Sequence, residues 1–241
     1  PRSAAEVPLE ARRRIEAFHA VGVSFALIDT GRGAPFEARA LRLALDHADP
    51  LLLAPTLVME AGYEGATGER GQRRAARLLV EVDRILAATE DPYLHAARRM
   101  IQGFLDYHAG TFAAAAENLV VMEREFGALP GRYFERVFCH CFGLICRRNA
   151  GQWGTLDAGF DDWVRQAERR GDRFTEASLR FNLNGVWLVR DDPDEALRDL
   201  TRVSWIPPTG GYHVQHWYEQ QARAEIALYT GRVHEGLQEF R

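Results

Sequence analysis

Apolar residues recur along most of the chain at intervals of three or four, the period of a helix with one buried face. In the first such segment, from about residue 8 to residue 30, Ile15, Phe18 and Val21 follow this spacing. No run of alternating polar and apolar residues is long enough for a useful strand. The pattern therefore predicts an all-α protein.

The spacing and its interruptions predict a series of helices over residues 8–30, 34–47, 50–66, 71–89, 92–109, 112–126, 132–150, 153–170, 173–190, 194–203, 213–230 and 233 to the end. Three starts carry an aspartate followed by proline, at residues 49–50, 91–92 and 192–193. The carboxylate can accept from free backbone N–H groups, and proline at the first helical position loses no hydrogen bond.

Glycine follows apolar helical sequence at a regular interval. The positions are Gly31, Gly68, Gly110, Gly151 and Gly231, with gaps of 37, 42, 41 and twice 40 residues. The missing position falls at residues 191–193, where Asp-Asp-Pro replaces glycine. A period near 40 residues built from two helices indicates a TPR-like α-α superhelix, or solenoid, of about six hairpins. We expect residues 1–241 to form a single such domain within a larger protein.

Composition excludes several kinds of active site. All 30 basic residues are arginine, so a P-loop, a protein kinase centre or a Schiff-base site has no lysine here. Cys139, Cys141 and Cys146 lie on one predicted helix, where they cannot pair or converge on a metal, so we expect buried free thiols. Residues 22–26, Gly-Val-Ser-Phe-Ala, lack the last glycine of a hydrolase elbow. The sequence thus predicts no enzyme activity, no metal and no cofactor for this chain.

Charge and hydropathy narrow the range of partners. The net charge is −4, and arginine doublets such as Arg73-Arg74 are dispersed, so we expect no nucleic-acid partner. RNA-reading helical repeats remain the alternative. No apolar stretch approaches the length of a membrane span. The unpaired cysteines suit a reducing compartment, so we expect a cytoplasmic protein without a membrane partner.

One predicted helix, residues 173–190, carries polar residues and a tryptophan on a shared face. Glu176, Arg180, Asn184 and Trp187 follow at intervals of four, four and three residues. Such a face could line the groove in which a solenoid holds a peptide or partner segment. The alternative is a solvated face with one Glu–Arg pair.

Two imidazoles, His213 and His216, lie three residues apart at the start of a predicted helix. They join the candidate binding face. Two ligands do not make a metal site, so the alternatives for this pair are packing and helix capping.

Several segments resemble the C-terminal TPR-like region of large bacterial serine/threonine protein kinases that carry a predicted ATPase module. They are residues 211–218 (GYHVQHWY), 224–231 (AEIALYTG), 29–41 (DTGRGAPFEARAL) and 191–196 (DDPDEA). The likeness covers most of the chain. It implies a regulatory or scaffolding module, with every catalytic motif of the kinase upstream of it.

We therefore expect a non-catalytic helical-repeat module of a signalling kinase or ATPase. Its partner would be a protein or peptide, or upstream domains of the same polypeptide. The alternative is a sensor that binds a small molecule or peptide in a concave groove.

Overall fold

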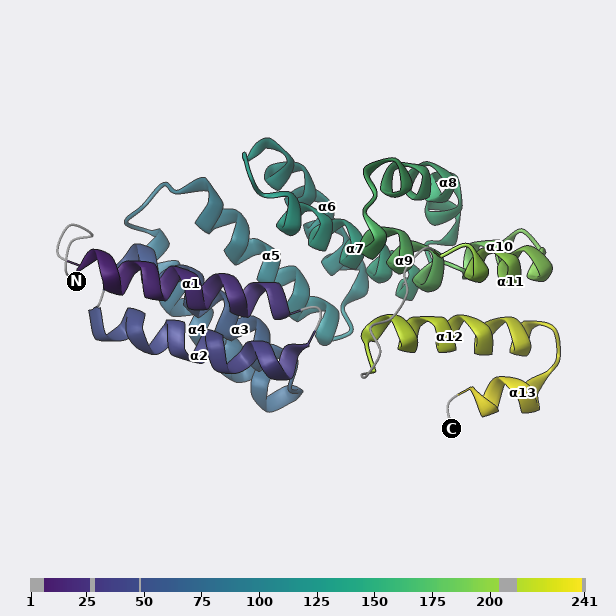
Figure 1. Cartoon of the computed structure of the whole chain (residues 1–241), viewed down its shortest axis with the longest axis horizontal. Helices are drawn as coiled ribbons and strands as arrows, with labels where there is room; N and C mark the ends of the chain where they lie inside the picture. Colours follow the sequence, from purple (N-terminus) through teal and green to yellow (C-terminus); the bar gives the residue numbers. More distant parts are fainter. Residues whose placement is uncertain (1–6, 27–28, 48, 204–211, 240–241) are drawn as a thin grey trace. The chain divides into compact units, whose positions relative to one another are not determined.

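The computed structural model describes residues 7–26, 29–47, 49–203 and 212–239, and it contains only helices and their connections over these residues (Figure 1). The all-α prediction is confirmed. None of the described helices combines the length and apolar character that a bilayer span requires.

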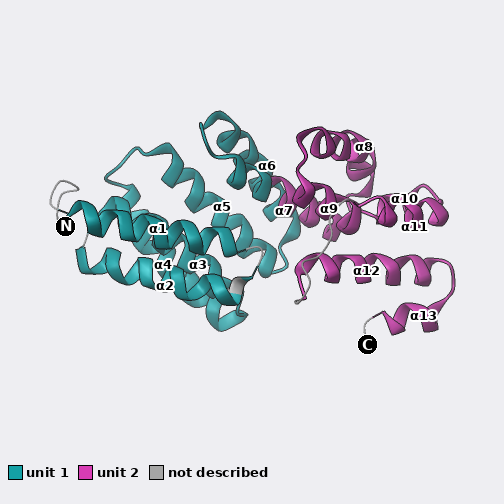
Figure 2. Ribbon diagram, viewed as in Figure 1, with its two compact units in different colours: residues 1–139 teal, residues 140–241 magenta. Residues whose placement is uncertain are grey.

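The chain divides into two compact units, residues 1–139 and 140–241 (Figure 2). Unit 1 contains α1 (Leu9–Phe25), α2 (Thr30–His47), α3 (Pro50–Gly65), α4 (Glu69–Leu86), α5 (Pro92–His108), α6 (Phe112–Ala128) and the first part of α7 (Tyr133–Asn149). Unit 2 contains the rest of α7, α8 (Trp153–Arg170), α9 (Arg173–Asn182), α10 (Gly185–Val189), α11 (Pro193–Thr201), α12 (Val214–Tyr229) and α13 (Val233–Gln238). The single continuous domain stays a prediction.

The three Asp-Pro starts behave as predicted. Asp49 accepts from the backbone N–H of Leu51 at 2.8 Å, and Asp91 accepts from the first turn of α5 in the same way. Asp192 accepts from the N–H of Glu195 at 2.9 Å. Each carboxylate therefore satisfies donors that the helix itself leaves free.

Left-handed residues close the helices at a regular interval. Among the described residues they are Gly110, Gly131, Gly151, Gly171, Asp191 and Gly231, with φ between 57° and 79°. Gly68 also has a positive φ, but it is the N-cap of α4 and does not close α3, which ends at Gly65. From Gly110 onward the steps are 21, 20, 20, 20 and 40 residues. Asp191, the residue at the predicted missing position, is the non-glycine member, so it takes the backbone conformation of the glycine it replaces.

The closures at residues 110, 151, 171, 191 and 231 share one pattern of hydrogen bonds. At Gly151, the next N–H, of Gln152, donates to the carbonyl of Arg147, and the N–H of Gly151 donates to that of Arg148. At Asp191 the pattern is the same: the N–H of Asp192 donates to the carbonyl of Trp187, and the N–H of Asp191 donates to that of Leu188. These are Schellman caps, which satisfy carbonyls that a helix end would otherwise leave free.

The first glycine of the predicted series does not close a helix. Gly31 lies inside α2, and α1 ends at Phe25. Asp29 caps the start of α2 by accepting from the N–H of Arg32, and a Cβ at Gly33 would meet the Tyr63 hydroxyl at 2.6 Å. Gly33 therefore serves close helix packing, which the sequence signal for a helix end does not distinguish.

The predicted helix 173–190 is divided into α9 and α10. Around the break the N–H groups of Val186 and Trp187 donate three residues back instead of four. A Cβ at Gly185 would lie 2.7 Å from the Trp153 ring, so glycine permits α10 to pack against α8. The remaining helix ends lie within about three residues of prediction.

Among the described residues of unit 2, buried apolar side chains form one cluster over α7, α8, α9 and α10 and another over α9, α11 and α12. Within unit 1, neighbouring helices pack as the pairs α1 with α2, α3 with α4 and α5 with α6. Cys139, Cys141 and Cys146 are buried and form no disulfide, as predicted, and burial raises the pKa of Cys139.

Replacing Gly151 with alanine should destabilise the protein by about 1–2 kcal/mol, because L-residues are strained at its φ of 74°. A Cβ there meets nothing within 4 Å, so the effect isolates the backbone term. Urea unfolding followed by circular dichroism measures it.

Gly154→Ala is the matched control. Gly154 lies inside α8, where a Cβ also meets nothing within 4 Å, so alanine should stabilise by about 0.5–1 kcal/mol. Equal effects at the two sites would contradict the assigned role of the left-handed closure.

Candidate functional site

The structure brings the four candidate residues of α9 and α10 together, but inside unit 2. Glu176, Arg180 and Asn184 are only 5%, 6% and 1% exposed, and Trp187 is partly buried. The predicted shared face exists, but it does not line an open groove. Both α8 and α12 pack against the short helix α9 and cover its faces.

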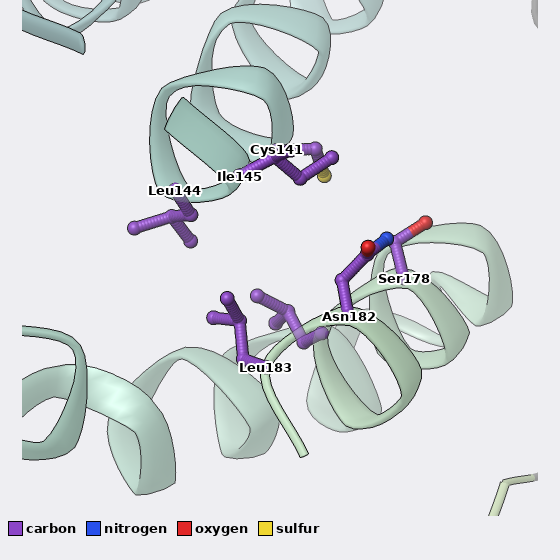
Figure 3. Close-up of a pocket in the computed structure, with 7 residues that line it drawn as sticks. Cys141, Leu144, Ile145, Ser178, Asn182 and Leu183 are labelled. Atoms are coloured by element: carbon purple, nitrogen blue, oxygen red, sulfur yellow. The ribbon is translucent and has the colours of Figure 1, made fainter. Parts of the chain in front are cut away.

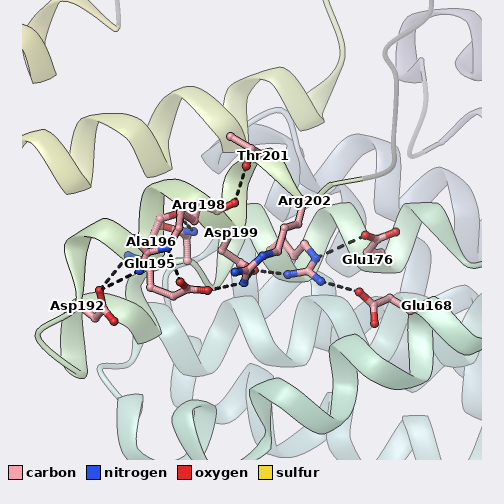
Figure 4. Close-up of polar contacts among 11 residues, drawn as sticks. Glu168, Glu176, Asp192, Glu195, Ala196, Arg198, Asp199, Thr201 and Arg202 are labelled. Carbon is pink, nitrogen blue, oxygen red and sulfur yellow. Dashed lines mark hydrogen bonds and ion pairs between the residues drawn. The ribbon is translucent and has the colours of Figure 1, made fainter.

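Arg180 is the centre of an ion network whose carboxylates, Glu168, Glu176 and Asp199, are labelled in Figure 4. Its Nη1 donates to Asp199 of α11, and its Nη2 donates to Glu168 Oε1 of α8 at 2.6 Å. Glu176, one turn before it on α9, has Oε1 3.4 Å from Arg180 Nε. One guanidinium therefore connects three helices of unit 2.

The network continues along α11. Arg202 lies 3.8 Å from Asp199 Oδ1 and also pairs with Glu195, which accepts from Arg198 at 2.7 Å. Burial raises the pKa of Asp199, while the Arg180 charge, the Trp187 indole and Arg202 act in the opposite direction. The carboxylate is held by cations within the fold, and its side chain has no exposure for a substrate to reach.

Asn184 and Trp187 also have structural partners. Asn184 Nδ2 donates to the carbonyl of Ala196 at 3.0 Å, which ties the break between α9 and α10 to α11. The Trp187 ring packs edge-on against Phe160, with centroids 5.9 Å apart, and the Arg190 guanidinium lies over it. These contacts hold the Asn184 amide nitrogen and the Trp187 ring inside unit 2, while Asn184 Oδ1 and Trp187 Nε1 are buried without a hydrogen-bond partner among the described residues.

The histidine pair is arranged as a helix start. His216 Nδ1 accepts from the backbone N–H of His213 at 2.9 Å, and the two rings stack with centroids 5.7 Å apart. The capping alternative is confirmed. Over the described part of the chain, no three His, Cys, Asp or Glu side chains are grouped to hold a metal ion.

A small cavity lies between α7 and α9 (Figure 3). Its lining is mostly apolar, with Cys141 on one helix and Ser178 and Asn182 on the other. Its volume of about 10 Å³ leaves room for about one water molecule. It has no room for a metabolite, so it does not supply the groove that the sensor alternative needs.

The sequence analysis missed a surface on α4. Arg70, Arg73, Arg74 and Arg77 are exposed and line one hollow of unit 1 together with Ala76. The opposite side of α4 is buried at Gly71, Ala75, Leu79, Val82 and Leu86. We define the four arginines as the α4 arginine face.

The signal for this face was present in the sequence. Its members occupy positions i, i+3, i+4 and i+7, which one helix turns to the same side. This spacing is not visible when the arginines are counted only as dispersed doublets. The net charge of the whole chain does not describe the charge of a single helix face.

No protein-family model matches this chain, and no curated protein matches it in sequence. The resemblance to kinase-associated repeat regions therefore stays a prediction.

Replacing Arg180 with methionine should destabilise the protein by roughly 3–5 kcal/mol, because Asp199 and Glu176 then lose their buried cation. Urea unfolding measures the change. Adding Asp199→Leu should recover part of the loss, since it removes one uncompensated charge.

Arg165→Met is the matched control, because Arg165 pairs with Asp162 on the exposed side of α8. Its effect should stay within about 0.5 kcal/mol. Wild-type stability in the Arg180→Met variant would rule out a structural role for the network.

Proposed function

We propose that this chain is a non-catalytic scaffold or regulatory module that binds a protein partner or another part of the polypeptide carrying it. The finer architecture that we propose is a TPR-like superhelix of about six helical hairpins. Its setting would be a bacterial signalling kinase or ATPase, as the sequence resemblance implies, and its compartment the cytoplasm.

The observation that carries the proposal is the Schellman closure repeated at multiples of 20 residues between Gly151 and Gly231. Closures 20 residues apart bound α8 and the segment of α9 and α10, and α8 packs against both of these helices. Repeats of this kind build extended surfaces, and proteins use such surfaces to hold partners.

The positions of the carboxyls whose pKa is raised support a binding role. Among the described residues, burial is the chief cause of a raised pKa at three carboxyls, Glu37, Glu60 and Asp199. Glu37 and Asp199 are fully buried and bonded inside their own units, while Glu60 is half-buried. Both oxygens of Glu37 lie within 3.2 Å of His19 Nδ1. Groups held in this way stabilise helix packing and do not face a bound substrate.

Deleting residues 1–241 from the kinase or ATPase that carries them should change how its activity responds to a partner. The response would change because the deletion removes the surface that receives the partner. The measurement is the rate of phosphotransfer or ATP hydrolysis with and without the partner.

ATP affinity of the deletion protein serves as the control for an intact catalytic domain. The isolated chain should show no phosphotransfer. Unchanged regulation together with unchanged partner binding after the deletion would contradict the proposal.

A further inference from the structure

The α4 arginine face carries more positive charge than its surroundings balance. Arg73 pairs with Glu69, and Arg74 Nη2 lies 3.2 Å from Glu64. Within the part of the chain that the structure describes, Arg70 and Arg77 form no ion pair. The exposed guanidiniums of Arg70 and Arg77 can therefore donate hydrogen bonds to carboxylate or phosphate oxygens of a partner.

The position of these arginines on the helix increases their attraction for anions. Arg70, Arg73 and Arg74 lie in the first two turns of α4, at the end where the helix dipole is positive. The residue before the helix, Gly68, gives no side-chain cap to the first N–H groups. Helix stability favours the opposite charge at this end, so the stability of α4 does not explain three arginines there.

The same side of α4 also presents an apolar strip. Ala76 and Val80 are exposed one turn apart, and Val80 keeps 50% of its surface open. Arg73 lies three residues before Ala76, and Arg77 lies three residues before Val80. A complementary partner would therefore combine negative charge with a small apolar contact.

We infer that the α4 arginine face docks an acidic amphipathic helix of a protein partner. This inference rests on the proposed binding function and names the chemistry of the partner. Arg70 and Arg77 are separated by about 10 Å along the helix axis. Carboxylates two turns apart on a partner helix have the same separation, so a helix lying along α4 reaches both.

The carboxylates around the face favour a protein over a nucleic acid. Glu69 is on the same exposed side, and Glu81 and Asp83 follow Val80 in the next turn. A phosphate backbone laid along the helix would meet these negative charges. A protein helix can instead place neutral or basic residues opposite them and carboxylates opposite the arginines.

The test measures binding of the full chain to a fluorescein-labelled acidic helical peptide by fluorescence anisotropy. The peptide has about 15 residues, with glutamate and leucine on one face, because shorter helices are marginal in water. We expect saturable binding that weakens as salt is added. Arg70→Gln combined with Arg77→Gln should weaken binding roughly tenfold.

The matched control is Arg13→Gln combined with Arg14→Gln on α1. Both arginines are exposed and form no ion pair among the described residues. Replacing them removes two positive charges, as the Arg70→Gln and Arg77→Gln pair does. Binding should stay within about twofold of wild type, because Arg13 and Arg14 lie on α1 and not on the α4 arginine face. Gln and Arg have similar helix propensity, so the substitutions should also leave α1 folded. Circular dichroism establishes that both double variants fold.

Three outcomes overturn the inference. They are no binding of the acidic peptide, equal losses in the two double variants, and tighter binding of a single-stranded oligouridylate of equal charge than of the peptide. If the deletion in the parent protein still alters regulation, such a result removes only the α4 assignment. If the deletion also has no effect, the binding function fails with it.

Discussion

Left-handed closure of the helices is the constraint on which the other features of unit 2 depend. A helix can end in a Schellman cap only where one residue tolerates positive φ, and Gly151, Gly171, Asp191 and Gly231 occupy the capped positions among the described residues of unit 2. Their spacing fixes helix length and the direction of each following helix. Apolar stripes at the helical period then meet their neighbours and form the two buried clusters of unit 2.

The Arg180 network is a consequence of this regular packing. Because α8, α9 and α11 are held side by side, charges on their facing sides leave water together. Desolvation of such groups is costly, and it is offset only when several partners surround each charge. Arg180 has three carboxylate partners and Asp199 has two arginines, so these polar residues of unit 2 specify contacts between helices.

Local chemistry made much of the fold predictable from the sequence. Asp-Pro starts, glycine closures and the substitution at Asp191 all act through the backbone of a few adjacent residues. The environment of a side chain was less predictable. The spacing of Glu176 and Arg180 shows that they share a face, but burial of that face depends on α8, α11 and α12. Likewise, Gly33 and Gly185 reflect close approaches to Tyr63 and Trp153, which no local pattern contains.

The central claim is that exposed helix surface binds a partner while the buried polar residues of unit 2 only support the fold. Hydrogen–deuterium exchange of the full chain, with and without the acidic helical peptide, tests this claim most directly. The account predicts added protection in α4 and unchanged exchange in α9 and α11. Protection in α9 and α11 with none in α4 would contradict it.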